Sequence, residues 1–324
     1  MRALAVVAGV VVVAHAASLA AQPAKSVRVG FLSSTAESGV GGRVEAFRQG
    51  LRDLGYVEGQ NLRIEYRWAG GRDDRLPALA ADLVRSGVDV IVTQGTPPTL
   101  AARQATATIP IVFAVLGDAV GAGLVASMGR PGGNVTGLTS IAPDLAGKRL
   151  ALLRQALPGL ARGVVLANPT NPLSVREVKE TIAAGHSLGL PLQIREASRP
   201  EQLEEIFATL RGERATAVIV LSDVMLSSQR ALISDLALGN RLPVVAWTQE
   251  FVESGSLMSY GPNILDMHRR AAVMVDRILK GARPADLPVE QPTTFELAVS
   301  LRTARILGLT IPPAVVLQAD RVIR

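Results

Sequence analysis

Two stretches of the chain carry the same pattern: residues 88–97 read VDVIVTQGTP, and residues 216–223 read TAVIVLSD. Each is a short, mostly β-branched run that ends in small polar residues, which is typical of a buried strand in a parallel sheet. A second pair repeats the likeness, since IPIVF at 109–113 matches LPVVA at 242–246. The two pairs have nearly the same separation and keep their order. The sequence therefore predicts two lobes of similar topology.

The alternation of strands and helices continues along the chain. Strands are predicted at 27–32, 62–68, 88–93, 111–115, 163–166, 192–195, 217–221 and 244–247. Apolar residues recur at helical spacing in 44–54, 76–84, 174–188, 203–210 and 226–238. Strand–helix alternation of this kind favours parallel sheets with helices on both faces. The fold class is therefore α/β, with two Rossmann-like lobes.

The N-terminal segment, residues 1–21, predicts a secretory signal peptide. Arg2 is its only charged residue, 3–14 are apolar, and two small-residue cleavage patterns follow. The alternative is an uncleaved membrane anchor, because this segment is nearly long enough to span a bilayer. We expect export to the periplasm with cleavage, and no lipid attachment because the chain has no cysteine.

The bulk composition fits a well-packed protein of two lobes. With 324 residues, 48% of them hydrophobic and 19% charged, the chain is long enough to bury large cores. The absence of cysteine excludes disulfides, cysteine catalysis and thiolate metal sites. The net charge is +6, but the arginines are scattered among acids and aromatic residues make up only 3%. This distribution indicates a solvated surface, and we expect no nucleic-acid partner.

Ligands of open parallel sheets bind outside the carboxyl ends of the strands. After the strand predicted at 88–93, Thr96 and Pro97 predict the start of a helix, with Thr96 as its cap. The free backbone amides at that helix start would hold a carboxylate. Asp118 or Asp223 would hold an amine, and Trp247 would form an apolar or stacking wall. The alternative is that these polar residues only cap helices and that Trp247 belongs to the core. The candidate ligand-binding residues are Ser33, Ser34, Thr96, Asp118, Asn168, Asp223 and Trp247.

Catalytic patterns are scarce. His15 lies in the predicted signal, and His186 and His268 fall on predicted helices, where we expect them at the surface. No histidine pair has metal-ligand spacing, and the nucleophile-elbow and P-loop motifs are absent. The glycines of 121–126 imitate a dinucleotide fingerprint but do not follow their strand directly, so we expect them to start a closely packed helix. The sequence predicts no cofactor, no metal and no enzymatic activity.

Several segments together resemble one family. They are GYVEGQN at 55–61, IEYRW at 64–68, RLPALA at 75–80, RPGGNVTG at 130–137, LMSYG at 257–261 and PTTFEL at 292–297. The chain resembles the ABC-importer substrate-binding proteins related to the tryptophan/tyrosine-binding group, which have the type I periplasmic binding-protein fold. It departs from them at Ala119, where proline is common, and at 247–249, where relatives more often carry tyrosine and then arginine.

The resemblance implies two lobes joined by three crossings, with a ligand cleft between them. We expect the crossings near 140–143, 253–256 and 283–287. The first lobe would then hold 27–141 and 255–283, and the second 142–254 and 284–324. By position, Ser33, Ser34, Thr96, Asp118, Asn168 and Asp223 would line the cleft.

The expected function is a monomeric periplasmic receptor that captures an amino acid or another small carboxylate. It would deliver this ligand to an ABC permease in the inner membrane, which a cytoplasmic ATPase drives. One alternative is a ligand-binding sensor that feeds a membrane signalling receptor. Others are an exported enzyme, or the effector lobe of a transcription regulator, which would begin with a helix-turn-helix in place of the signal.

Overall fold

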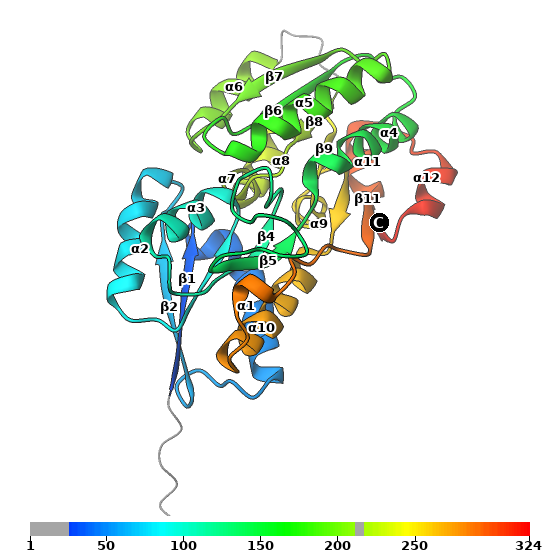
Figure 1. The fold of residues 1–324 in the computed structure, drawn as a ribbon. Coiled ribbons are helices and arrows are strands. Elements are labelled where there is room, and N and C mark those ends of the chain that lie inside the picture. Colours follow the sequence, from blue (N-terminus) through cyan, green and yellow to red (C-terminus); the bar gives the residue numbers. More distant parts are fainter. Residues whose placement is uncertain (1–25, 211–216) are drawn as a thin grey trace, which may run out of the picture.

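The computed structural model describes residues 26–210 and 217–324, so the predicted signal with His15 lies outside the described residues. Within them the chain forms two sheets, each covered by helices on both faces (Figure 1). This arrangement confirms the predicted α/β class and its two lobes. No helix in the described part of the chain is long and apolar enough to cross a membrane.

The first sheet is fully parallel and has the strand order β2-β1-β3-β4-β5. Helices α2 and α3 cover one face of it, and α1 and α10 cover the other (Figure 1). Because both faces are covered, strands such as β3 and β4 are buried along their whole length. The elements are β1 (Val27–Ser33), α1 (Glu37–Asp53), β2 (Leu62–Trp68), α2 (Leu76–Arg85), β3 (Val90–Gln94), α3 (Thr96–Ala105), β4 (Ile111–Leu116), β5 (Val135–Thr139) and α10 (Ile264–Leu279).

The second sheet has seven strands in the order β12-β11-β10-β9-β8-β6-β7, and only the β10–β11 pair is antiparallel. Helices α4, α11 and α12 pack on one face, and α6 and α8 on the other. Its strands are β6 (Gly163–Ala167), β7 (Leu192–Glu196), β8 (Ala217–Val220), β9 (Val244–Ala246), β10 (Met258–Pro262), β11 (Phe295–Ser300) and β12 (Arg321–Ile323). Its helices are α4 (Ala146–Ala156), α5 (Pro172–Ser187), α6 (Gln202–Leu210), α7 (Val224–Ser228), α8 (Arg230–Gly239), α9 (Gln249–Glu253), α11 (Leu301–Leu307) and α12 (Pro313–Gln318).

Two of the expected crossings differ in the structure. Strand β10, which the sequence places in the first lobe, pairs with β9 and β11 of the second sheet, so the chain crosses after Pro262. The segment after α10 stays with the first lobe, because Glu290 pairs with Leu138 of β5. The third crossing therefore falls between 290 and 295. Backbone hydrogen bonds to neighbouring strands decide both positions, and composition does not reveal them.

Ile141, which follows β5, has a left-handed backbone with φ of 46°. A β-branched residue rarely adopts that conformation, which costs on the order of 1–3 kcal/mol. The 121–126 segment forms turns and not the expected helix start.

Candidate functional site

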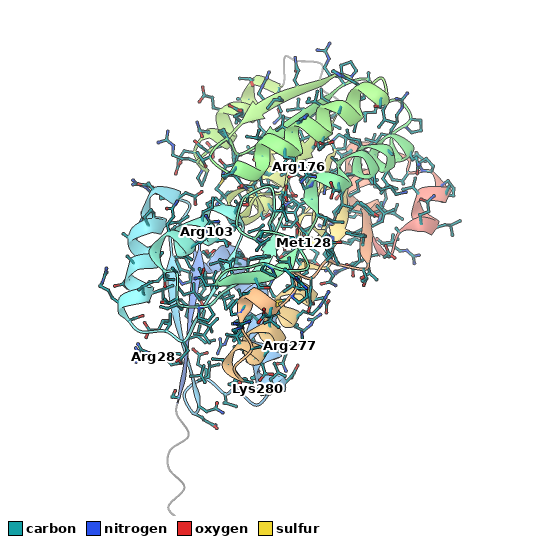
Figure 2. The ribbon with its side chains drawn as sticks, in the orientation of Figure 1. Arg28, Arg103, Met128, Arg176, Arg277 and Lys280 are labelled. Carbon is teal, nitrogen blue, oxygen red and sulfur yellow. The ribbon has the colours of Figure 1, made fainter. Side chains whose placement is uncertain are left out.

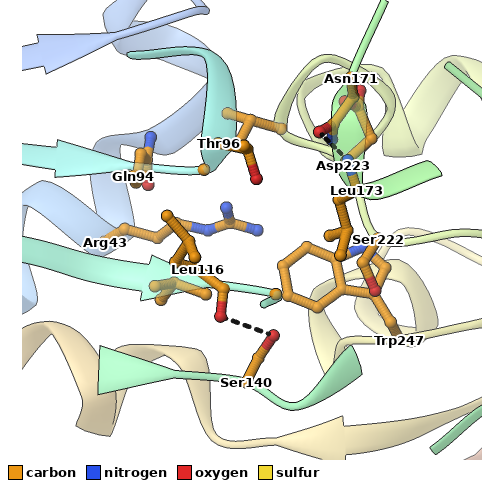
Figure 3. A pocket seen from close by; sticks show the side chains of 14 residues that line it. Arg43, Gln94, Thr96, Leu116, Ser140, Asn171, Leu173, Ser222, Asp223 and Trp247 are labelled. Carbon is orange, nitrogen blue, oxygen red and sulfur yellow. Dashed lines mark hydrogen bonds between the residues drawn. The ribbon is translucent and has the colours of Figure 1, made fainter. Parts of the chain in front are cut away.

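A cavity lies between the two sheets, at the carboxyl ends of their strands (Figure 3). The first lobe contributes the ends of β3, β4 and β5, and the second contributes the loops after β6, β8 and β9. Parallel sheets place ligand sites at these ends because the loops there converge. The cavity is lined by Arg43, Gln94, Gly95, Thr96, Val115, Leu116, Gly117, Ser140, Asn171, Leu173, Ser222, Asp223, Val224 and Trp247.

The structure brings three of the predicted residues, Thr96, Asp223 and Trp247, to the wall of this cavity. Asn168 lies behind the wall and donates from Nδ2 to Asp223 at 3.2 Å. Ser33 is also behind it, where its hydroxyl accepts from the Gln94 amide at 3.1 Å. Ser34 and Asp118 lie outside the lining, and Asp118 occupies the rim between the lobes.

Asp223 is a buried carboxylate in the cleft, with 5% of its surface exposed. Its side chain accepts from Leu226 N at 2.9 Å, Asn171 Nδ2 at 3.0 Å and Asn168 Nδ2. Asp223 thus caps α7, as expected if these polar residues cap helices, and it also lines the cavity. No lysine or arginine among the described residues forms an ion pair with it. Burial raises the pKa of Asp223 to about 6, although these hydrogen bonds oppose the rise.

Thr96 does not cap α3. The cap is Gly95, whose φ of 82° and closeness to Val224 of the other lobe both require glycine: a Cβ there would lie 2.7 Å from Val224 Cγ2. Thr96 is the first helical residue, and Pro97 and Pro98 follow it. Proline has no amide hydrogen, so the start of α3 offers fewer donors to a carboxylate than the sequence analysis expects.

Arg43 is the main residue that the sequence analysis missed. It lies on α1, its side chain is 1% exposed, and its guanidinium lies in the cleft toward Trp247 (Figure 3). The guanidinium carbon is 5.7 Å from the centroid of the Trp247 ring, within the range of a cation–π contact. Its Nε donates to both carboxylate oxygens of Glu250 on α9, at 3.1 and 3.2 Å. A lone arginine within a helical pattern carries no signal that it points inward.

His268 is buried, so the expectation that it lies at the surface is wrong. Its Nδ1 donates to the Ile264 carbonyl at 2.8 Å, and its Nε2 lies 3.1 Å from the Gln94 side-chain amide. Burial lowers the pKa of His268 to about 4, so the ring is neutral at pH 7. His186 is exposed, as expected.

A buried ion pair supports Ser222, another residue of the cavity wall. Glu177 on α5 accepts from the Ser222 amide at 2.9 Å and from its hydroxyl at 3.0 Å. Arg149 on α4 pairs with Glu177 at 3.2 Å, and both side chains are almost wholly buried. Burial lowers the pKa of Arg149, while Glu177 opposes that shift. This pair fixes the loop after β8 from behind.

The rim of the cleft carries a second contact between the lobes. Arg176 on α5 pairs with Asp118 of the first lobe and, at 3.1 Å, with Asp144. Figure 2 places Arg176 at the edge of the second lobe that faces the first. Asp118 also accepts from the Gly121 amide at 2.8 Å. The structure therefore gives Asp118 partners within the protein.

The closed cavity is very small, about 20 Å³, which is room for one water molecule. Nearer the rim, a wider cavity of about 650 Å³ lies between the 70–74 loop of the first lobe and residues 198–201 of the second. A ligand larger than water therefore enters the inner site only if the lobes or the lining side chains move.

A family model described as ABC transporter substrate binding protein matches residues 33–323, nearly the whole described chain. The tyrosine-binding protein of Clostridioides difficile strain R20291 is 26% identical over 82% of this chain and 76% of its own length.

Two solved structures are also similar over 92% of this chain and all of theirs. One is an ABC domain from Streptococcus pneumoniae in complex with L-tryptophan, with 25% identity and a TM-score of 0.85. The other is a conserved domain protein from Vibrio cholerae, with 28% identity and a TM-score of 0.86.

Proposed function

Because this chain belongs to the ABC transporter substrate-binding protein family, we propose that it binds an amino acid or another small carboxylate between its lobes. The observation that carries this proposal is Asp223, a buried carboxylate on the cavity wall without a cationic partner among the described residues. Burial of an unpaired charge is costly, and a ligand ammonium group would remove that cost.

The remaining lining supports a zwitterionic ligand with an apolar part. Trp247 and Leu173 supply apolar surface, while Arg43 and Asp223 supply opposite charges. Of the predicted site residues, Asp223, Thr96 and Trp247 would contact the ligand, and Asn168 and Ser33 would orient the residues that do. Ser34 and Asp118 would act at the rim. The tyrosine and tryptophan ligands of the relatives make aromatic amino acids the first candidates.

The two lobes would move as units about the three crossings. If the strand pairing defines the lobes, the first lobe would comprise residues 26–139 and 263–290. The second lobe would comprise the rest of the described chain. Ligand contacts to both lobes would favour the closed arrangement over the open one.

The protein would work in the periplasm after removal of residues 1–21, as an unlipidated monomer. Its partners would be the ligand and an ABC permease with its cytoplasmic ATPase, with no nucleic acid and no chemical step. Substrate-binding proteins of ABC importers act outside the cytoplasm, which agrees with the predicted signal.

A thermal-shift screen of amino acids, other carboxylates and sugars tests this function. A ligand at a hundred times its dissociation constant should stabilise the protein by about 2.7 kcal/mol. The Asp223→Asn variant should lose the shift for ligands with an ammonium group. Asp286→Asn, an exposed aspartate paired with Arg283, is the matched control and should keep it. Conversion of any compound into a product would contradict the receptor assignment.

A further inference from the structure

Two hydrogen-bond donors from opposite lobes lie on the wall of the same small cavity. Arg43 on α1 belongs to the first lobe, and Trp247, which follows β9, belongs to the second. The guanidinium carbon is 5.7 Å from the centroid of the Trp247 ring, and the two side chains point toward each other (Figure 3). A group bound between these two side chains therefore contacts both lobes at once.

Arg43 keeps one of its nitrogens for such a group. Its Nε and Nη2 donate to the Glu250 carboxylate on α9. Its Nη1 forms no hydrogen bond with any residue in 26–210 or 217–324. Because Glu250 takes the other two nitrogens, Nη1 is left for an acceptor in the cavity, and the ion pair holds the guanidinium in place.

Trp247 carries the second donor. The residue is 3% exposed, and its Nε1 has no hydrogen-bond partner in the described part of the chain. A buried N–H group without an acceptor is unfavourable, and an oxygen atom of a ligand would remove that cost. The indole N–H therefore indicates an accepting group in the cavity beside the ring.

Other polar side chains of the cavity wall direct their donors into the protein. The Ser140 hydroxyl donates to the Leu116 carbonyl at 3.4 Å, and the Ser222 hydroxyl donates to the Glu177 carboxylate at 3.0 Å. The Gln94 amide donates to a serine hydroxyl behind the wall at 3.1 Å. These groups are engaged, whereas Nη1 and Nε1 of the two residues above are not.

The charge near Arg43 also favours an anion. Burial raises the pKa of Glu250, but the charges of Arg43 and of Arg230 on α8 outweigh burial and lower this pKa to about 2. Arg230 donates to the Gly39 and Ser227 carbonyls at 3.1 Å and forms no ion pair with a carboxylate of the described residues. Two guanidinium groups thus face one carboxylate, and an anionic group would compensate the excess positive charge.

We propose that the carboxylate of the ligand bridges the two lobes, with one oxygen accepting from Arg43 Nη1 and the other from Trp247 Nε1. This inference rests on the proposed function and identifies the anionic group as the part of the ligand that joins the lobes. Trp247 then acts as a hydrogen-bond donor as well as an apolar wall. A carboxylate suits the two donors because it has two accepting oxygens and a negative charge.

Asp223 gives the bound ligand a direction. It lines the same cavity, so an amino acid would place its ammonium group at Asp223 and its carboxylate between Arg43 and Trp247. The inner cavity has room for about one water molecule, so the lobes or the lining side chains move to admit these groups. A solute without an anionic group would leave both donors without an acceptor.

Titration calorimetry with two variants tests the bridge. The probes are L-tryptophan and L-tyrosine, their decarboxylated amines tryptamine and tyramine, and D-arabinose as an uncharged solute. Trp247→Phe keeps an aromatic ring but removes the N–H group, so it should bind the two acids at least about tenfold more weakly. Arg43→Gln should weaken their binding by a similar factor. The amines should bind weakly to the wild type and respond little to either change, whereas a mere loss of packing would weaken the amines as well.

Matched controls lie in the first lobe, away from the cavity. Trp68→Phe in β2 and Arg48→Gln on α1 make the same two exchanges and should leave every affinity unchanged. If Arg43→Gln fails to fold because Glu250 is left buried without its partner, the Arg43→Gln/Glu250→Gln double variant removes both charges. It should fold and show the same loss of affinity for the acids.

Nuclear magnetic resonance reads the Trp247 donor directly. The chain has two tryptophans, so protein labelled with nitrogen-15 at the indoles gives two N–H signals, and Trp68→Phe assigns the signal of Trp247. Saturating L-tryptophan or L-tyrosine should move the Trp247 proton signal downfield, because a carboxylate accepts a hydrogen bond from it. Saturating tryptamine or tyramine should move this signal less.

Three results would overturn the inference and leave the receptor function intact. The first is that either variant binds the acids as tightly as the wild type does. The second is that the amines bind as tightly as the acids, or that D-arabinose alone binds. The third is a Trp247 N–H signal that does not move downfield at saturation with an acid. An acid that the thermal-shift screen finds in place of these two is titrated against its neutral methyl ester in the same way. If no compound in this panel or in that screen binds, the receptor function itself fails, and the inference fails with it.

Discussion

Burial and neighbouring charges shift the pKa values of three side chains at or beside the cleft. It raises the pKa of Asp223 to about 6 and lowers that of His268 to about 4. Burial alone would raise the pKa of Glu250. The charge and hydrogen bonds of Arg43 outweigh burial and lower this pKa to about 2. At pH 7 the site therefore holds one paired anion, one unpaired anion and a neutral imidazole.

The raised pKa of Asp223 predicts how ligand binding depends on pH. Only the ionised carboxylate pairs with an ammonium group, so the affinity for an amino acid should be constant above about pH 6. Below that value it should fall by up to about tenfold per pH unit. Titration calorimetry from pH 4.5 to 8 measures this. An affinity independent of pH across that range would mean that Asp223 does not contact the ligand's amine.

The lowered pKa of His268 predicts a loss of stability in acid. Because the unfolded state takes up a proton below pH 6.5 and the folded state only near pH 4, this contribution is full above pH 6.5 and is lost as the pH falls. Between pH 6.5 and 4, the free energy of unfolding of His268→Gln should therefore fall by roughly 3 kcal/mol less than that of the wild type. Urea unfolding of both proteins at each pH checks the difference. The contribution of Asp223 to stability changes with pH in the opposite direction, but it is the same in both proteins. Parallel plots of unfolding free energy against pH would contradict the burial of the His268 ring.

Among the secondary-structure elements, the sequence predicted those with an uninterrupted apolar pattern. The strands from β1 to β4 and from β6 to β9 lie where the β-branched runs predicted them. Strands β5, β10, β11 and β12 were missed. In β5 and β10, Gly137, Gly261 and Pro262 weaken the strand signal. Since β10 decides where the second crossing falls, missing it also moved the expected lobe boundary.

The glycine of β5 has a packing cause that a substitution can test. A Cβ at Gly137 would lie 2.1 Å from the Phe113 carbonyl oxygen of β4. Gly137→Ala should therefore destabilise the protein by about 3 kcal/mol or more. Gly41→Ala is the control, since nothing lies within 4 Å of its Cβ in α1, and it should be neutral or gain up to about 1 kcal/mol. Chemical denaturation measures both, and equal stabilities would contradict the close β4–β5 contact.

At the scale of the whole molecule, the sequence predicted the two lobes and the side of the sheets on which the cavity lies. Among the polar residues that follow strands, it named Asp223 and Thr96, which line this cavity. It missed Arg43 and Glu250 because both lie on helices, and only the tertiary packing of α1 against the second lobe brings them together. Contacts between lobes have no local sequence pattern.

Among the described residues, two ion pairs join the lobes, and they should differ in importance. Arg176 is 47% exposed at the rim, and surface pairs of this kind contribute about 0–1 kcal/mol. Arg176→Gln should therefore leave ligand affinity almost unchanged in 0.15 M salt, where titration calorimetry measures it. A loss of affinity of about tenfold or more would show that the rim pair governs closure.

The most direct test of binding between mobile lobes is a distance measured across the cleft mouth. The chain has no cysteine, so spin labels can be attached at Asp74→Cys and Arg199→Cys alone, on opposite walls of the rim cavity. Double electron–electron resonance measures the distance between the two labels. When the ligand identified by thermal shift is present at a saturating concentration, this distance should be shorter and more narrowly distributed than without ligand. A distribution that does not change while calorimetry records full binding would contradict the account.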